Sequence, residues 1–257
     1  MKRVASAANP LYAALKKQAE EPRARRKDGV AILDGAHLLG AALDAGLAPD
    51  LVAVGESRAD RPEVAGLIAR LPERAVMILP DSLADALSTV ETPTGLIARV
   101  ALPAPRATDG AAILLSDIQD PGNVGTMLRT AAAAGVKAAY LSAGCAEAWS
   151  PKALRAGMGA QFALAIHERA DLAAIVAAQP ARALAADLTA ARSLYDVALP
   201  ADCHFLFGNE GAGLDPALSA AAGLRIRIPM PGAAESLNVA ASAAVCLFEW
   251  VRQRTAK

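Results

Sequence analysis

Short apolar runs alternate with longer amphipathic stretches along most of this chain. Such alternation predicts strands joined by helices, and therefore an α/β protein. Within the first 100 residues we expect strands at 30–33, 51–54, 76–79 and 95–100, and helices at 36–45 and 64–71. Asn9 before Pro10 indicates the start of one more helix, and Asp81 that of a short one. Residues 1–100 are therefore predicted to form an amino-terminal helix and a small α/β domain.

The pattern breaks between residues 101 and 110, a stretch with prolines and no periodicity. We expect this stretch to be a linker. Beyond it the alternation resumes, with strands expected at 112–116, 138–141, 162–166, 181–185 and 203–207, and helices at 123–134, from Ser150, and at 172–178. Residues 111–257 are therefore predicted to form a second α/β domain.

The strand at 203–207 leads into a loop, Gly208 to Gly213, that contains three glycines. Glycines permit positive φ and let a ligand approach the backbone closely. A tight turn is the competing interpretation, because Gly-x-x-Gly-x-Gly is not the dinucleotide fingerprint. A further strand ends at Pro229. Because proline has no N–H to donate to a neighbouring strand, backbone groups are left free near the loop from Gly208 to Gly213. Ser236 is expected to cap the last helix, which has a wide apolar face.

Composition narrows the class of protein. The 257 residues carry 26 basic and 26 acidic side chains, so contact with nucleic acid would need a local basic patch. Hydrophobic residues make up 54% of the chain, but no apolar run is long enough to span a bilayer. The three cysteines are widely spaced, which argues against a disulfide framework and a zinc site. We therefore expect a protein with no membrane span and no bound metal, which functions in a reducing compartment.

The amino terminus lacks the continuous apolar segment of a secretory signal. Its basic, acid-free character up to Ala19 faintly resembles an organellar transit peptide. Asn9 followed by Pro10 favours an ordinary capped helix instead. We therefore expect a cytoplasmic protein.

Three segments, 113–135, the loop that begins at Gly208, and 228–238, resemble in that order the three motifs of the SpoU-like (TrmH-like) ribose 2′-O-methyltransferases of the SPOUT superfamily. Together they span about half of the chain. The resemblance implies a carboxyl-terminal domain with a parallel sheet and a deep trefoil knot, which no periodicity could reveal. It also implies S-adenosylmethionine as cofactor, RNA as substrate, and a homodimer in which each site borrows residues from the other chain. The apolar face of the last helix and its Trp250 favour an interface there.

The resemblance assigns the cofactor contacts to Gly208, Ile228, Met230 and Leu237. These residues are small or apolar. Their character suits a pocket that recognises adenine by backbone hydrogen bonds and packing.

Arg129 stands where this family places a residue that activates the ribose 2′-hydroxyl, sometimes as a general base. A guanidinium with a pKa above ~12 is a poor base. We therefore expect Arg129 to lean toward the loop mouth, bind the adjacent phosphate and orient the hydroxyl, with the proton acceptor left open. The catalytic polar set is completed by Asn123, Glu210, Ser236 and Asn238, for which helix capping and loop ordering are competing roles.

The first domain looks like the substrate-binding domain that precedes the catalytic domain in many of these enzymes, a fold shared with certain ribosomal RNA-binding proteins. Asp34 stands where that domain has a glutamate, and Gly157 where the family commonly has a serine. The contacts that the glutamate and the serine hydroxyl make in the family are therefore either absent here or made by other groups. Residues 21–29 are predicted to form a basic loop. Its cations are candidate RNA contacts, with a solvated face as the alternative: Arg23, Arg25, Arg26 and Lys27.

The leading interpretation is an S-adenosylmethionine-dependent enzyme that methylates a ribose 2′-hydroxyl in structured RNA, with rRNA favoured over tRNA. A catalytically silent RNA-binding protein of the same fold is the alternative, and the intact polar set argues against it. A nicotinamide-dependent enzyme is disfavoured. It would need Gly-x-Gly-x-x-Gly after an early strand and an acid about 20 residues later, and neither glycine loop fits.

Overall fold

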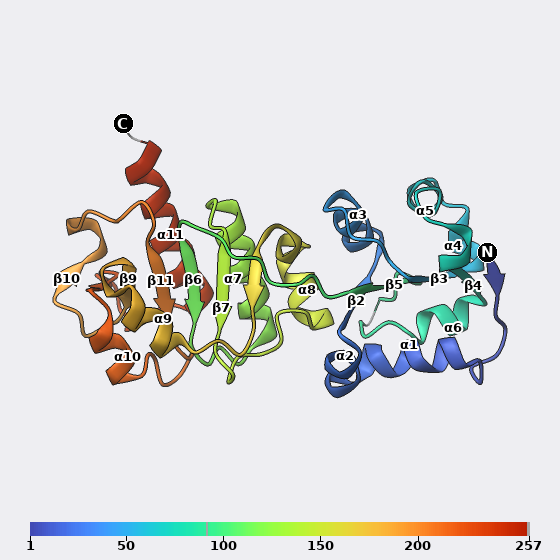
Figure 1. Cartoon of the computed structure of the whole chain (residues 1–257), viewed down its shortest axis with the longest axis horizontal. Coiled ribbons are helices and arrows are strands. Elements are labelled where there is room, and N and C mark those ends of the chain that lie inside the picture. Colours follow the sequence, from blue (N-terminus) through green and yellow to red (C-terminus); the bar gives the residue numbers. More distant parts are fainter. Residues whose placement is uncertain (91, 256–257) are drawn as a thin grey trace. The chain divides into compact units, whose positions relative to one another are not determined.

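The computed structural model describes residues 1–90 and 92–255, and the chain divides into two compact units (Figure 1). Unit 1 comprises Met1–Ala104 together with Trp149–Phe162, and unit 2 comprises Pro105–Ala148 and Ala163–Lys257. The first division falls inside the stretch expected to be a linker. The assignment of residues 149–162 to unit 1 has no counterpart in the sequence pattern.

Unit 1 is built on a five-stranded sheet of mixed direction, in the order β1-β4-β3-β5-β2. The strands are β1 (Lys2–Arg3), β2 (Val30–Asp34), β3 (Leu51–Gly55), β4 (Val76–Leu79) and β5 (Leu96–Ala101). Strands β1, β4 and β3 are parallel, whereas β5 is antiparallel to both β3 and β2. The strands predicted in this region are confirmed to within a residue of each end.

Helices cover both faces of this sheet. The face with the amino-terminal helix carries α1 (Pro10–Glu20), α2 (Pro22–Asp28) and α6 (Asp81–Asp85), and the other carries α3 (Ala36–Asp44), α4 (Glu56–Ala59) and α5 (Pro62–Ile68) (Figure 1). Helix α8 (Pro151–Gly157) also belongs to unit 1. The predicted caps Asn9 and Ser150 are confirmed, since each side chain accepts a backbone N–H from the first turn of its helix.

The expected basic loop at 21–29 is wrong, because residues 22–28 form helix α2. Pro22 opens it, and Gly29 ends it with a φ of 62°. Arg25 is only 5% exposed, and its Nη1 donates to the carbonyl oxygens of Gln18 (2.9 Å) and Ala19 (3.1 Å) at the end of α1. The guanidinium therefore caps a helix carboxyl terminus. The exposed cations of this segment are Arg23, Arg26 and Lys27.

Unit 2 contains a seven-stranded sheet in the order β10-β12-β9-β11-β6-β7-β8, in which every neighbouring pair is parallel. Its strands are β6 (Ala112–Leu115), β7 (Ala138–Leu141), β8 (Ala165–His167), β9 (Ala183–Ala186), β10 (Arg192–Ser193), β11 (His204–Phe207) and β12 (Leu224–Arg227). The parallel α/β architecture expected for this half is thus confirmed. The strand predicted at 162–166 begins late, because residues 160–163 form a 3₁₀ turn.

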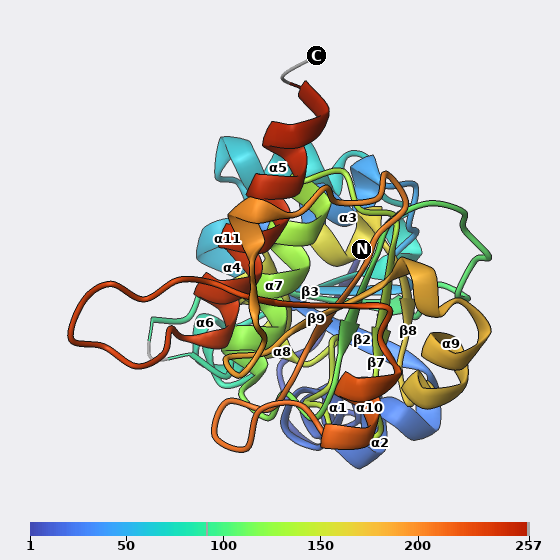
Figure 2. The ribbon, with the colours of Figure 1, turned by 90° about the vertical axis from the view of Figure 1, so that its left-hand side faces the viewer.

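Helices lie on both faces of this sheet (Figure 2). One face carries α7 (Pro121–Ala133) and α11 (Val239–Thr255), which pack against each other, and the other carries α9 (Leu172–Ala178) and α10 (Pro216–Ala221). Leu172 and Val176 of α9 pack on Leu114 and Leu206, which are fully buried in the central strands. Among the described helices, none is both long and apolar enough to cross a bilayer.

Arg25→Ala should lower the free energy of unfolding by about 1–3 kcal/mol, because it leaves the carbonyl oxygens of Gln18 and Ala19 without that donor in a buried position. Urea unfolding followed by circular dichroism measures the change. Arg23→Ala on the same helix is the matched control. Arg23 is exposed, so this change should stay within about 0.5 kcal/mol of the parent. Equal effects of the two substitutions would contradict the capping role.

Candidate active site at the carboxyl edge of the unit 2 sheet

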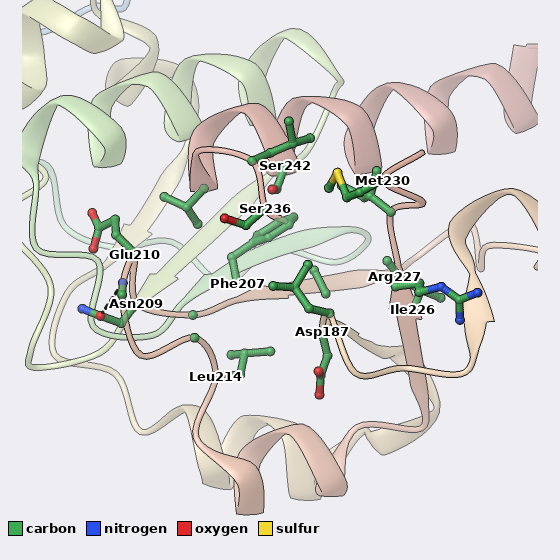
Figure 3. Close-up of a pocket in the computed structure, with 18 residues that line it drawn as sticks. Asp187, Phe207, Asn209, Glu210, Leu214, Ile226, Arg227, Met230, Ser236 and Ser242 are labelled. Atoms are coloured by element: carbon green, nitrogen blue, oxygen red, sulfur yellow. Dashed lines mark hydrogen bonds between the residues drawn. The ribbon is translucent and has the colours of Figure 1, made fainter. Parts of the chain in front are cut away.

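The carboxyl ends of β6, β9, β11 and β12 meet at one edge of the sheet, because these strands are parallel neighbours. In open parallel sheets, ligands bind outside this edge. A cavity of about 190 Å³ lies there. Figure 3 shows Asn209 and Glu210 at one end of it, and Arg227 and Met230 at the other. Its lining comes from the segments 186–188, 207–214, 226–230 and 236–242.

Gly208, directly after β11, has no room for a side chain. A Cβ at this position would overlap backbone atoms of Gly213 and Leu214. Asn209 fixes the loop from within, since its Oδ1 accepts the N–H groups of Gly211 and Ala212, both at 2.9 Å. The amide of Asn209 also donates to the carbonyl oxygen of Asp117 at 2.8 Å, which ties this loop to the one after β6. The loop from Gly208 to Gly213 is therefore a closed turn whose backbone lines the cavity.

Glu210 connects this loop to the start of α7. Its carboxylate accepts the N–H of Gln119 (3.2 Å), the N–H of Asp120 (3.1 Å) and the side-chain amide of Asn123 (3.0 Å). Partial burial would raise the pKa of Glu210, but these hydrogen bonds, led by that from Asn123, lower it below its ordinary value. Glu210 is therefore an anion at neutral pH and a weak base.

Asn123 and Asn238 extend the network to the third segment. Asn238 Nδ2 donates to Asn123 Oδ1 at 3.1 Å, and Asn238 Oδ1 accepts the N–H groups of Ala240 (2.9 Å) and Ala241 (3.3 Å). Asn238 is therefore the cap of α11. The prediction that Ser236 caps this helix is wrong, since the helix begins at Val239 and Ser236 lines the cavity.

The start of α7 also differs from the prediction. The helix begins at Pro121 and is capped by Asp120, whose Oδ1 accepts the N–H of Gly122 at 2.5 Å. Proline is favoured in a first turn because its φ is already helical. Asn123 therefore lies inside the first turn, where its side chain is available to Glu210 and Asn238.

Arg129 stands apart from this network. It follows Asn123 by six residues, which is about 9 Å along the helix and about 240° around it. The side chain is exposed, does not line the cavity, and makes no hydrogen bond or ion pair with any residue that the structure describes. The expectation that Arg129 leans into the loop mouth of its own chain is therefore not met.

All four candidate cofactor contacts line the cavity: Gly208, Ile228, Met230 and Leu237. Leu237 is 40% exposed and belongs to an exposed stretch, 231–238, that contributes to one wall. The cavity is smaller than the range of about 300–1,000 Å³ typical of small-molecule sites. The candidate RNA contacts Arg23, Arg25, Arg26 and Lys27 lie in unit 1.

Asp187, which the sequence pattern did not single out, lines the cavity after β9. Its Oδ1 accepts the N–H and hydroxyl of Thr189, and its Oδ2 accepts from Ser219 and Arg225, all within 2.8 Å. Burial would raise the pKa of Asp187, but the hydrogen bonds from Ser219, Thr189 and Arg225 hold it far below its ordinary value. Its acceptor positions are filled, so Asp187 supports the wall. An Asp two residues before a Thr, directly after a strand, is the turn signal that could have identified it.

Across residues 1–90 and 92–255, no group of three or more His, Cys, Asp or Glu side chains is arranged to hold a metal ion. The site instead combines a backbone turn and apolar side chains with a polar network at one end. Such a lining suits a ligand with an apolar, planar part and a polar end.

Residues 110–248 match the family model described as "SpoU rRNA Methylase family". The chain is 32% identical over 253 residues to the 23S rRNA (guanosine(2553)-2′-O)-methyltransferase RlmP of Bacillus subtilis, with 96% of this chain and 98% of that protein covered. A crystal structure of an RNA 2′-O ribose methyltransferase superimposes with a TM-score of 0.83 and 30% identity, covering 98% of this chain and 99% of that one. An AdoMet-bound rRNA methyltransferase from Sinorhizobium meliloti gives a TM-score of 0.82 and 26% identity, covering 99% and 98%.

The contacts of Glu210 should be lost in acid. Because the folded-state pKa lies below the ordinary value of 4.5, the stabilisation is complete above that value and is lost as the pH falls through the lowered pKa. The amide proton shift of Gln119, measured by NMR, should follow this titration. In Glu210→Gln this shift should lose that dependence on pH. Titration at or above 4.5 in the parent chain would contradict the assignment.

Proposed function

Because the chain belongs to the SpoU rRNA methylase family, we propose that its substrate is ribosomal RNA and that its active form is a homodimer. The chain is an S-adenosylmethionine-dependent enzyme that methylates ribose 2′-hydroxyls of RNA. The observation that carries the assignment of the site is the hydrogen-bonded chain Glu210–Asn123–Asn238, which joins the three motif segments at the cavity.

The cavity fits S-adenosylmethionine in the character of its lining. The turn at Gly208 brings backbone groups to the surface of the cavity, and Ile228, Met230 and Leu237 offer apolar contacts to an adenine ring. When bound, the cofactor supplies a methyl group on a sulfonium, which is already activated for transfer. We include the deep trefoil knot in the proposal. It is supported by the match of residues 110–248 to the SpoU family, for which the resemblance implies the knot.

The remaining requirements of methyl transfer are alignment and deprotonation of the ribose hydroxyl. Glu210 is fully engaged in hydrogen bonds and has a lowered pKa, so we assign it to ordering the loops rather than to accepting the proton. Arg129 carries an unpaired guanidinium among the described residues, and we assign it to binding the phosphate beside the target ribose. Ser236 and Asn238 lie at or beside the cavity and complete the polar set.

The dimer is proposed because the site of a single chain lacks Arg129 in its lining. Arg129 and Phe248 are exposed on α7 and α11, two helices that pack together, and Phe248 leaves half of its surface uncovered. Trp250, expected to serve the interface, is instead buried in its own chain, where its Nε1 donates to the Pro200 carbonyl at 2.8 Å. Phe248 therefore replaces Trp250 as the proposed apolar contact between the two chains.

Ribosomal RNA as substrate is supported by the named activity of the Bacillus subtilis relative, which matches this chain over nearly its full length. We assign recognition of the RNA to unit 1, and place the enzyme with the ribosomes in the cytoplasm. Mapping of 2′-O-methylation in total RNA from cells with and without the gene tests the substrate. Loss of a methyl group from tRNA alone would contradict it.

Gly208→Ala should weaken the binding of S-adenosylmethionine at least tenfold, because the added Cβ displaces the backbone at Gly213 and Leu214. Isothermal titration calorimetry measures the affinity. Gly232→Ala is the matched control, since Gly232 has open space around its Cβ position and no positive φ, and should bind as the parent does. We expect a chelator to leave both affinities unchanged. Parent-like binding by Gly208→Ala would remove this loop from the cofactor site.

Arg129→Ala should lower single-turnover methylation of ribosomal RNA by about 10²-fold or more while it spares cofactor affinity, because its contact aligns the reacting hydroxyl.

Light scattering should give a mass near twice 26.2 kDa. If the two chains share each site, co-refolding Arg129→Ala with Gly208→Ala should restore about a quarter of parental activity, because mixed dimers hold one intact site. No recovery, with mixed dimers demonstrated, would place Arg129 in the site of its own chain.

A further inference from the structure

Unit 1 contains a cavity of about 610 Å³, larger than the one at the edge of the unit 2 sheet. It lies where β2 ends and α3 begins, and residues of α4, α5, the segment 93–96 and the segment 155–158 also line it. All of these belong to unit 1. The volume is within the range of about 300–1,000 Å³ typical of small-molecule sites. No step of the proposed methyl transfer uses this cavity.

The lining of this cavity includes a substantial apolar part. Leu38, Val64 and Leu96 are almost fully buried and form part of it. Met158 also lines the cavity, with 41% of its surface exposed. An exposed thioether beside buried aliphatic side chains offers a planar ring a surface on which to pack.

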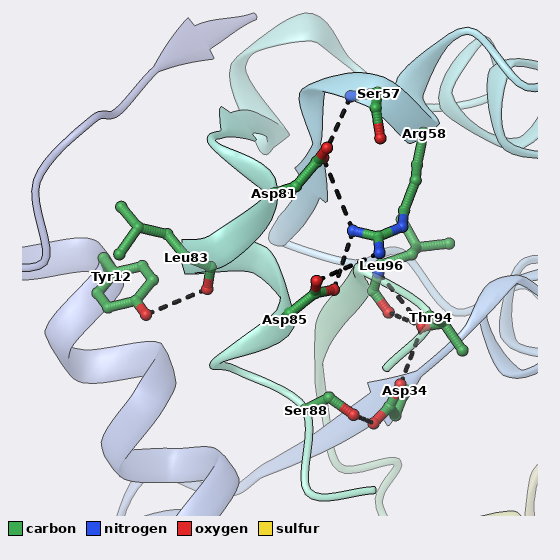
Figure 4. Close-up of polar contacts among 10 residues, drawn as sticks. All are labelled: Tyr12, Asp34, Ser57, Arg58, Asp81, Leu83, Asp85, Ser88, Thr94 and Leu96. Atoms are coloured by element: carbon green, nitrogen blue, oxygen red, sulfur yellow. Dashed lines mark hydrogen bonds and ion pairs between the residues drawn. The ribbon is translucent and has the colours of Figure 1, made fainter. Parts of the chain in front are cut away.

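Two charged residues of the lining, Arg58 and Asp34, are already engaged in ion pairs or hydrogen bonds with neighbouring side chains (Figure 4). Arg58 forms ion pairs with Asp85 at 2.9 Å and Asp81 at 3.7 Å. Asp34 accepts the hydroxyl groups of Ser88 at 2.5 Å and Thr94 at 3.0 Å. The shortened acid at position 34 thus holds the segment that carries Thr94 against β2. These contacts fix the wall of the cavity and leave ligand binding to other groups.

The groups left for a ligand are mixed in charge. Arg61, Arg155 and Glu63 are exposed, line the cavity, and form no hydrogen bond or ion pair through their side chains with the residues that the structure describes. His37 Nε2 lies 3.3 Å from the Met158 carbonyl oxygen, to which it donates, and in the neutral imidazole this bond makes Nδ1 the acceptor. The rim therefore offers cationic donors, a carboxylate and a ring nitrogen around an apolar interior.

We propose that this cavity captures one unpaired nucleotide of the substrate RNA, an inference that rests on the proposed function. An unstacked base needs an apolar surface and donors and acceptors for its edge, and its flanking phosphates need cations. The cavity supplies each of these. A groove for phosphates alone would not carry Glu63 and Asp34 in its lining. A base inside an A-form duplex is stacked and paired, so the site favours single-stranded segments.

The test uses the full chain and two fluorescent RNA probes, a 15-nucleotide single strand of mixed sequence and the duplex of the same sequence, titrated by anisotropy. Arg61→Ala/Arg155→Ala should weaken single-strand binding about tenfold and lower its salt slope by about 1.4, since each phosphate contact adds about 0.7. Binding of the duplex should change less than twofold. The control Arg74→Ala/Arg106→Ala removes two exposed arginines that do not line the cavity, and should leave single-strand affinity within twofold.

A second variant separates the cavity from its charge. Ala36 lines the cavity, so Ala36→Phe should fill it, weaken single-strand binding and leave the salt slope unchanged. Circular dichroism and cofactor affinity confirm that each variant is folded. Three results would overturn the proposal: no preference of the parent for the single strand, equal losses on both probes in the arginine variant, or parental single-strand affinity in Ala36→Phe. Failure of the parent to methylate ribosomal RNA would instead overturn the proposed function.

Discussion

One carboxylate holds together three segments that are distant in the sequence. Glu210, in the loop after β11, accepts two backbone N–H groups that precede α7 and the amide of Asn123 within it. Asn123 in turn accepts the amide of Asn238, which caps α11. Because charged acceptors make the stronger hydrogen bonds and this one stays ionised, the loops around the cavity have a common anchor. The parallel sheet makes this possible by bringing the carboxyl ends of the strands to a single edge.

The two units divide the physical tasks. In unit 2, the backbone shapes much of the cavity, since the turn at Gly208 leaves no space for a side chain. The carboxylate oxygens of Asp187, which lines the cavity, accept hydrogen bonds from Thr189 and Ser219. In unit 1, side chains dominate, with ion pairs and hydroxyl contacts that surround an open, partly apolar cavity. A backbone-lined pocket suits one invariant small molecule, whereas a side-chain rim can be varied to suit different nucleic acids.

Much of the fold could be predicted from the sequence, because the strands are short apolar runs with clear ends and Asn9 and Ser150 are local caps. The three motif segments could also be found from local signals, because glycines, prolines and asparagines fix the local geometry of the chain. The predictions that failed concern side chains whose positions depend on contacts distant in sequence. The burial of Arg25 is decided by the end of α1, and that of Trp250 by Phe205, against which its ring packs edge-on at 5.8 Å. The direction of Arg129 depended on where α7 begins and how it packs.

Gly157 illustrates how a neighbour can fix the identity of a residue. A Cβ at this position would overlap the side-chain amide of Gln161, which is fully buried and donates to the Ala153 carbonyl at 2.9 Å. A serine here would therefore require the end of the Gln161 side chain to shift and give up its bond to the Ala153 carbonyl. In evolutionary terms we expect the two positions to be coupled, so that serine at 157 is accommodated more easily when a smaller residue stands at 161.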